Sequence, residues 1–121
     1  MVAGLVVRRN RFGRGVYTTA RIARGQIVAQ CPVLVWPVTV AADEFIGRYV
    51  WSWKDSRGHD HALEALCLGL PSLFNHDPKP NTGSQRFYRR RRMVFKALRN
   101  IAAGEEILID YGAGASGFDV R

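Results

Sequence analysis

Short apolar runs separated by turn residues make up most of this chain, and they predict strands rather than long helices. Strand-like composition marks four segments, Leu5–Val7, Val16–Thr19, Ile27–Trp36 and Ile107–Ile109. Pro32 interrupts the longest of them. Because proline has no backbone N–H to donate to a neighbouring strand, it predicts an edge strand or a bulged one. Residues 85–98 predict a hairpin whose alternation is broken by arginines.

One segment carries apolar residues at helical spacing. They are Phe45, Ile46, Tyr49, Val50 and Trp53, and Thr39 ahead of them is a suitable N-cap. Residues 63–70 predict a second segment, short and helical or irregular, before Pro71. Glycine and proline are frequent and helical patterns are scarce, so we expect a mostly β, compact and irregular domain with short helices.

The length of 121 residues predicts one domain over residues 1–121, with a core over about residues 6–112 and a short tail over 113–121. No run of about 18 apolar residues occurs, so we expect no membrane span. The first residues lack the charged-then-apolar order of a signal peptide. Cys31 and Cys67 lie in apolar surroundings, which favours buried, reduced thiols in a cytoplasmic protein over a disulfide.

The formal net charge of +8 and the pI near 10.3 predict attraction to polyanions and acidic proteins. The same charge would repel a lysine-rich peptide unless an acidic patch lies in its binding groove. Five arginines gather around Phe87 and Tyr88, namely Arg86, Arg89, Arg90, Arg91 and Arg92. They predict either a nucleic-acid contact, with the two rings as stacking partners, or a solvated strand edge that resists aggregation.

A polar pair, Asn75 and His76, stands between the apolar residue Phe74 and two prolines, Pro78 and Pro80. The prolines forbid a regular helix here, so the pair is expected in a rigid turn. In isolation, such a pair fits a structural turn as well as a binding site.

Three segments together carry a family resemblance. They are Gly13–Tyr17 (G-R-G-V-Y), Asn75–Asn81 (N-H-D-P-K-P-N) and Gly104–Gly112 (G-E-E-I-L-I-D-Y-G). In this order and spacing they resemble the motifs of the SET-domain protein lysine methyltransferases. The resemblance runs from about Val6 to Gly112 and is to a minimal, bacterial or viral type of core without zinc-binding flanks. It implies small curved sheets around a C-terminal pseudo-knot.

The resemblance also implies S-adenosylmethionine as the cofactor. The residues that match cofactor-binding positions are Arg14, Gly15, Val16, Tyr17, Asn75, His76 and Tyr111, with Phe118 as a hypothetical cover over the adenine. Tyr111 matches the family's catalytic tyrosine, and Tyr49 falls near a second tyrosine of the lysine channel. Ile109 stands where the family commonly has Phe or Tyr, which predicts room in the channel for di- or trimethylation.

The implied reaction is methylation of a lysine on a protein substrate, with a histone or a basic nucleoid protein as the candidate. The expected location is the cytoplasm or nucleoid or, for a viral protein, the host nucleus. Two alternatives remain, a basic nucleic-acid-associated module without turnover and a cofactor-binding interaction protein. Exposed Trp36 and Trp51 would favour a homodimer that completes the substrate groove. His59 and His61 lack a second pair of ligands, so a solvated loop is expected there and no metal is predicted.

Overall fold

The computed structural model describes residues 4–40, 46–59 and 62–111. Its elements in chain order are strands β1 (Leu5–Asn10), β2 (Gly13–Thr18) and β3 (Ile27–Pro37), the 3-10 helix η1 (Ile46–Tyr49), strands β4 (Val50–Trp53) and β5 (Leu63–Cys67), the 3-10 helix η2 (Leu70–Leu73), and strands β6 (Asn75–His76), β7 (Thr82–Phe87), β8 (Arg92–Ala97) and β9 (Leu108–Ile109). The predicted mostly β class with short helices is confirmed.

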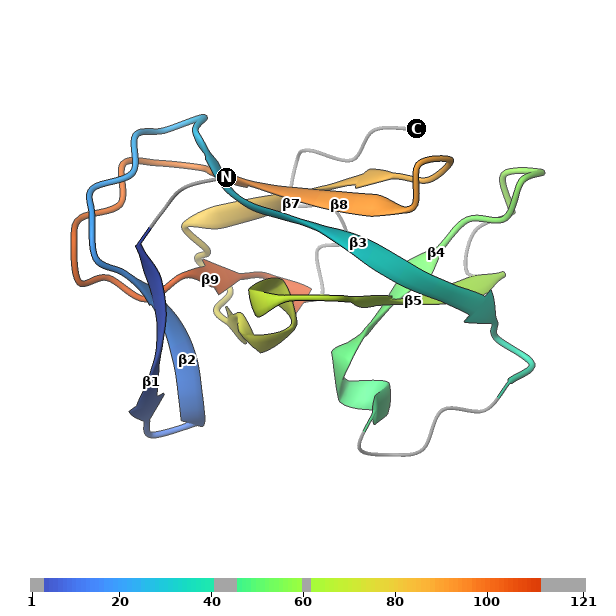
Figure 1. Cartoon of the computed structure of the whole chain (residues 1–121), viewed down its shortest axis with the longest axis horizontal. Helices are drawn as coiled ribbons and strands as arrows, with labels where there is room; N and C mark the ends of the chain where they lie inside the picture. Colours follow the sequence, from blue (N-terminus) through green and yellow to red (C-terminus); the bar gives the residue numbers. More distant parts are fainter. Residues whose placement is uncertain (1–3, 41–45, 60–61, 112–121) are drawn as a thin grey trace.

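These strands form three sheets (Figure 1). β1 and β2 make an antiparallel hairpin, β6 and β9 make a two-stranded parallel sheet, and the other five strands make one sheet in the order β4-β5-β3-β8-β7. The β1–β2 hairpin lies at one end of the molecule, and the β4–β5 loop lies at the other (Figure 1). The small β6–β9 sheet lies between them and joins segments that are far apart in the sequence.

Strand β3 is central and not the edge strand that Pro32 predicted. Up to Pro32 it pairs with β8, and beyond Pro32 it pairs with β5. The Pro32 carbonyl accepts the Leu68 N–H at 3.0 Å, just past the end of β5 at Cys67. Because the N–H and C=O of one strand residue point to the same side, the N–H that proline lacks would also face the end of β5. The bulge occurs elsewhere, as a register shift between Ile27 and Ala29.

The segment predicted as a helix contains only η1, and its last residues form β4, while residues 41–45 lie outside the described part. β4 pairs with β5, which replaces most of the helical or irregular structure predicted for residues 63–70. Both predictions were wrong because each segment finds a strand partner in the other. Such long-range pairing overrides the weak local preference of a few apolar residues at helical spacing.

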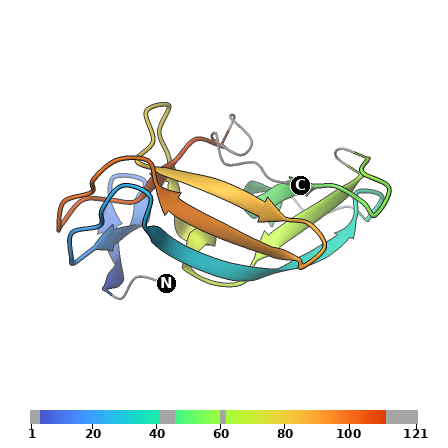
Figure 2. The ribbon, with the colours of Figure 1, turned by 90° about the horizontal axis from the view of Figure 1, so that it is seen from above.

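The five-stranded sheet twists strongly (Figure 2), and side chains connect its two edge strands, β4 and β7. Arg86 of β7 donates from Nε to the Ser52 carbonyl of β4 at 3.2 Å, and its guanidinium lies 5.4 Å from the centre of the Trp51 ring. Trp53 meets Tyr88 edge to face at 5.0 Å. Arg86 is only 4% exposed, so its predicted part in a nucleic-acid contact is wrong. Strand alternation explains this, because it turns Arg86 toward the inside of the sheet.

The two tryptophans that favoured a homodimer are half-buried. Trp36 donates its indole N–H to Glu64 Oε1 at 3.3 Å, and Trp51 packs edge to face on Phe95 at 5.9 Å. The expectation that these rings are exposed was therefore wrong, and they offer no basis for self-association.

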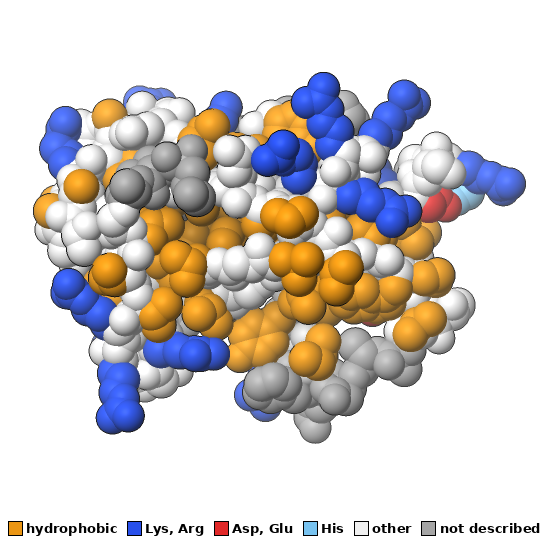
Figure 3. Space-filling model, viewed as in Figure 1, with side chains coloured by type: hydrophobic (Ala, Val, Ile, Leu, Met, Phe, Trp, Pro, Cys, Tyr) orange, Lys and Arg blue, Asp and Glu red, His pale blue; other side chains and the backbone are white. Residues whose placement is uncertain are grey.

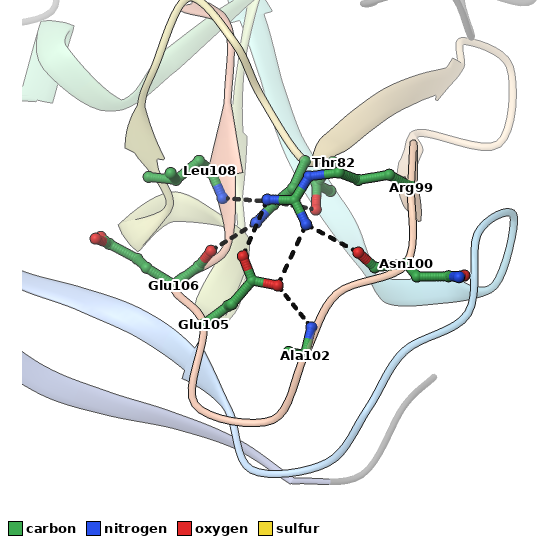
Figure 4. Close-up of polar contacts among 8 residues, drawn as sticks. Thr82, Arg99, Asn100, Ala102, Glu105, Glu106 and Leu108 are labelled. Atoms are coloured by element: carbon green, nitrogen blue, oxygen red, sulfur yellow. Dashed lines mark hydrogen bonds and ion pairs between the residues drawn. The ribbon is translucent and has the colours of Figure 1, made fainter.

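Strand β9 runs between two parts of one loop, residues 75–81. On one side it pairs with β6, and the Asp77 N–H donates to the Ile109 carbonyl at 2.9 Å. On the other side the Leu108 N–H donates to Asn81 Oδ1 at 2.9 Å, and the Asn81 Nδ2 donates to the Glu106 carbonyl at 2.7 Å (Figure 4). The crossing of the C-terminal segment implied by the resemblance is therefore present.

The hydrophobic core is built from side chains of the large sheet and of the segment around β9. Phe74 and Phe95 meet edge to face at 5.3 Å, and both are almost fully buried. Cys31 and Cys67 are buried in the same core with free thiols. Over the described residues, no helix reaches the length and apolarity of a membrane span.

Replacing Asn81 by alanine should lower the free energy of unfolding by about 2–3 kcal/mol, because its carboxamide serves the Glu106 carbonyl and the Leu108 N–H in a buried site. Urea denaturation followed by tryptophan fluorescence measures this loss. Asn100→Ala is the matched control, since its exposed Oδ1 accepts the Arg24 N–H, and it should cost less than about 1 kcal/mol. Equal losses in the two variants would contradict the role given to the crossing.

Candidate active site

Two cavities meet at a shared wall in the middle of the molecule. The larger one, about 480 Å³, is lined by Arg9, Phe12, Gly13, Arg14, Tyr49, Ser72, Leu73, Phe74, Asn75 and Tyr111. The smaller one, about 100 Å³, is lined by Arg48, Tyr49, Val50, Trp51, Pro71, Ser72, Phe74, Ile109 and Tyr111. Tyr49, Ser72, Phe74 and Tyr111 belong to both linings, so these four residues form the wall between a wide cavity and a narrow one.

Tyr111 is fixed at this wall by two hydrogen bonds to the segment before the prolines. Its hydroxyl donates to the Phe74 carbonyl at 2.5 Å, and its backbone N–H donates to His76 Nδ1 at 2.9 Å. Burial raises the pKa of the Tyr111 phenol, and the neighbouring Tyr49 and Glu106 add to the effect. The phenol therefore stays neutral at physiological pH and acts as a fixed hydrogen-bonding group.

Asn75 joins the larger cavity to the residues behind it. Its Nδ2 donates to the Arg14 carbonyl at 2.9 Å and to Glu106 Oε2 at 2.7 Å. One amide thus connects β6, the glycine turn of β2 and the segment before β9. These bonds orient the side chain and leave its Oδ1 available to a ligand in the cavity.

Glu106 also holds the β1–β2 hairpin, because Asn10 Nδ2 donates to the same Oε2 at 3.2 Å and to the Tyr17 hydroxyl at 3.2 Å. Gly15 lies directly over this cluster. A Cβ there would collide with Glu106 Oε2 and would lie only 2.7 Å from Asn10 Nδ2 and 2.9 Å from Asn75 Nδ2. The second glycine of the turn is therefore required by close packing.

The structure brings some of the predicted cofactor residues to the larger cavity and leaves others behind its wall. Arg14, Asn75 and Tyr111 line the cavity, and Gly15 lies over the Glu106 cluster. Val16 is fully buried in the core and Tyr17 holds Asn10 by its hydroxyl, so neither side chain is part of the lining.

His76 is not part of the described lining and instead accepts the Tyr111 N–H. Phe118 lies outside the described residues. The predicted residues Tyr49 and Ile109 both line the smaller cavity, and Tyr49 lines the larger one as well. Ile109 is 2% exposed and ends β9, so its side chain limits the space beside Tyr111.

Six residues of the larger cavity were not among the predicted site residues, namely Arg9, Phe12, Gly13, Ser72, Leu73 and Phe74. Phe12 had a usable signal, since a large aromatic residue stands in a hairpin turn next to a glycine. It is 60% exposed, and the Arg11 guanidinium lies 4.8 Å from the centre of its ring. Ser72 and Leu73 had none, because they belong to the short η2 that only the tertiary structure brings to the site.

Of the two histidines considered as metal ligands, the structure describes only His59. His59 Nδ1 pairs with Asp55 Oδ2 at 2.9 Å in an exposed loop, and His61 lies outside the described residues. Across residues 4–40, 46–59 and 62–111, no three His, Cys, Asp or Glu side chains gather as possible metal ligands.

The structure combines a twisted sheet with a C-terminal strand held inside a loop, and two cavities flank one tyrosine. These features place the chain in the class of SET folds. The SET domain family model matches residues 13–112 of this chain. The chain therefore belongs to the SET-domain family.

A histone-lysine N-methyltransferase of Schizosaccharomyces pombe, specific for H3 lysine 37, is 29% identical over 110 residues, which cover 84% of this chain and 68% of the relative. A crystal structure from Plasmodium falciparum, assigned as a histone methyltransferase, has a TM-score of 0.72 at 22% identity and covers 93% of this chain and 96% of that one. The Chaetomium thermophilum Polycomb Repressive Complex 2 bound to S-adenosylmethionine has a TM-score of 0.72 at 20% identity, over 98% of this chain and 16% of that one. Both structures share the fold.

The predicted class, a SET-type protein-lysine methyltransferase that uses S-adenosylmethionine, is confirmed at the level of the family. The larger cavity fits such a cofactor, because about 480 Å³ lies within the usual range of about 300–1,000 Å³ for small-molecule sites. Its lining offers an aromatic ring at Phe12, an oriented amide at Asn75 and a neutral hydroxyl at Tyr111. Gly15, without a Cβ, preserves the packing behind that amide.

Replacing Gly15 by alanine should weaken the affinity for S-adenosylmethionine by about tenfold or more, because the added Cβ displaces Glu106 and with it the Asn75 amide. Isothermal titration calorimetry measures the affinity, and circular dichroism checks the fold. Gly47→Ala is the matched control, since a Cβ at Gly47 meets no atom within 4 Å. An unchanged affinity in a folded Gly15→Ala protein would contradict the packing argument.

Proposed function

We propose that this chain transfers methyl groups from S-adenosylmethionine to a lysine of a histone or of another basic, histone-like protein. The observation that supports the proposal is the pair of cavities that share the wall of Tyr49, Ser72, Phe74 and Tyr111. A cofactor in the wide cavity and a lysine in the narrow one would approach each other only at this wall.

S-adenosylmethionine, when bound, supplies a methyl group that is already activated by the positive sulfur. The residues of the chain therefore need to align the partners more than to activate them. Tyr111 is suited to alignment, because its hydroxyl is anchored to the Phe74 carbonyl and its N–H is anchored to His76. Two bonds to one rigid segment hold the ring at a fixed place in the wall.

The lysine amine must lose its proton before it can accept a methyl group, and its ordinary pKa is about 10.4. The lining of the narrow cavity favours the neutral amine in two ways. Its apolar walls at Val50, Pro71 and Ile109 remove water from the charged form, and the Arg48 cation repels it. None of the described residues in this lining is acidic, so no carboxylate holds the amine in its charged state.

The substrate class is supported by the curated relative, whose name specifies a lysine of histone H3. That protein is 29% identical to this chain, so the match carries the class of substrate and not the particular lysine.

Tyr111→Phe should lower the rate of methyl transfer by about 100-fold or more, because the ring loses the bond that fixes it at the wall. Its affinity for S-adenosylmethionine should stay within about threefold. Transfer of radiolabelled methyl groups to histones measures the rate, and calorimetry measures the affinity. Tyr88→Phe removes the same atom outside both cavities and should leave the rate within about twofold. A Tyr111→Phe protein with normal turnover would refute the role of the tyrosine.

Ile109 is proposed to leave room for more than one methyl group, since the side chain at this point of the lining is aliphatic and not an aromatic ring. The wild type should form di- or trimethyllysine, and Ile109→Phe should shift the product toward monomethyllysine. Mass spectrometry of the modified substrate measures the product distribution. Ile109→Leu conserves the volume and should keep the wild-type distribution. A wild-type product that stops at monomethyllysine with an efficient substrate would contradict this proposal.

A further inference from the structure

A third cavity, of about 810 Å³, has no lining residue in common with the two that share Tyr111. It lies between the tip of the β7–β8 hairpin and the β4–β5 loop. Its lining consists of Trp53, Lys54, Asp55, Ser56, Gly58, Leu63, Phe87, Tyr88, Arg89, Arg90 and Arg91. Four of these side chains are cationic and one is anionic, so the cavity, called the basic groove below, carries an excess of positive charge.

Three consecutive arginines, Arg89, Arg90 and Arg91, form the tip of the hairpin and are exposed. Arg91 has a φ of +51°, a conformation that usually falls to glycine, asparagine or aspartate. An arginine in this backbone conformation is less stable than a glycine would be, but it adds a third guanidinium to the tip. Backbone strain that persists in this way points to a function of the residue that carries it.

The base of the basic groove is rigid and aromatic. Tyr88 packs edge to face on the buried Trp53 at 5.0 Å, and the Lys54 ammonium lies 5.4 Å from the centre of the Tyr88 ring. These contacts fix Tyr88, the residue just before the three arginines, so the arginines extend from a rigid part of the hairpin.

The single acid of the basic groove, Asp55, is engaged by its own loop. Its Oδ1 accepts the N–H groups of Arg57 and His59, both at 2.9 Å, and its Oδ2 pairs with the His59 ring. The bond from the His59 backbone N–H is the main reason that the pKa of Asp55 lies below its ordinary value. This carboxylate is therefore oriented by its own loop, and its single negative charge stands against the four cations of the lining.

Two arginines that the sequence grouped with the tip do not belong to this surface. Arg86 is buried under Trp51, and Arg92 is half-buried and donates to Gln30 Oε1 at 3.0 Å. Lys and Arg side chains nevertheless gather around the tips of the hairpin and of the β4–β5 loop, at the upper right of the space-filling view (Figure 3). Exposed arginines therefore gather at this end of the molecule, and a second group, Arg8, Arg9, Arg11 and Arg14, lies on the β1–β2 hairpin at the other end.

We propose that the basic groove and the hairpin tip bind the phosphate backbone of duplex DNA. Planar guanidinium groups match the geometry of phosphate oxygens, and neutralising successive phosphates releases condensed counterions. The net charge of +8 favours a polyanion over any neutral or basic ligand.

The placement relative to the narrow cavity connects this surface with the proposed function, on which this part of the inference rests. β4 begins at the narrow cavity with Val50 and Trp51 and reaches the basic groove with Trp53 and Lys54. Four residues of strand span about 10 Å. A chain of charge +8 would repel a free lysine-rich protein. Bound DNA would reverse that repulsion and present such a protein next to the channel.

Binding of a fluorescein-labelled duplex of mixed sequence, followed by anisotropy, tests the groove directly. Arg89→Ala combined with Arg90→Ala should weaken binding by about tenfold and reduce the slope of log affinity against log salt by about two. Arg21→Ala combined with Arg24→Ala removes the same charge from exposed arginines of the β2–β3 connection, at the opposite end of the molecule (Figure 1), and should change affinity by less than about threefold.

Equal losses in the two double variants, or no binding by the wild type at low salt, would overturn the proposal. Displacement of the DNA by polyglutamate as readily as by unlabelled duplex of equal charge would also overturn it, since the groove would then be a site for acidic proteins.

Methylation assays separate this inference from the proposed function. The Arg89→Ala/Arg90→Ala protein should lose kcat/KM about tenfold on histones assembled with DNA and keep the wild-type value on free histones. A similar loss on both substrates would contradict a DNA contact. If the wild type methylates neither substrate, the proposed function fails, and the anisotropy measurement still decides whether the basic groove binds DNA.

Discussion

The parallel pairing of β6 with β9 is the constraint on which the rest of the structure depends. It joins Asn75 to Leu108 and His76 to Ile109, and Asn81 closes the opposite side of the same strand. Because β9 is bonded on both sides, a shift by one residue would break the bonds to β6 and to Asn81 together. The register of this short strand therefore sets the position of Tyr111 against the Phe74 carbonyl, and with it the wall between the two cavities.

Two adjacent glutamates extend this constraint in opposite directions. Glu106 faces inward, where one carboxylate oxygen accepts both the Asn75 and the Asn10 amides and so joins the β1–β2 hairpin to the crossing. Glu105 faces outward, where Arg99 lowers its pKa and its Oε2 accepts the Ala102 N–H (Figure 4). The turn before β9 is thus fixed at the surface by an ion pair and in the interior by amides. The bonds of Glu106 to Asn75 and Asn10 therefore help to set the shape of the wide cavity.

The sequence predicted the parts of this fold whose signals are local. Short strands followed from apolar runs, and three motifs identified the site segments before any contact was known. The helical spacing around Tyr49 led to a wrong prediction of a helix, because β4 pairs with β5 and periodicity does not reveal such a partner. Arg86 misled because a run of arginines indicates a surface, whereas Trp51 and Ser52, which hold it inside, lie far away in the sequence. Glu106 stood inside a recognised motif, yet its bonds to Asn10 and Asn75 exist only after folding.

The central claim is that one wall separates the cofactor from the lysine. A crystal structure with S-adenosylhomocysteine and a lysine-containing histone peptide tests it most directly. The account predicts the cofactor product in the cavity lined by Arg14 and Asn75, the lysine in the cavity lined by Val50 and Ile109, and Tyr111 between them. Both ligands on one side of Tyr111, or a cofactor product bound elsewhere on the molecule, would contradict it.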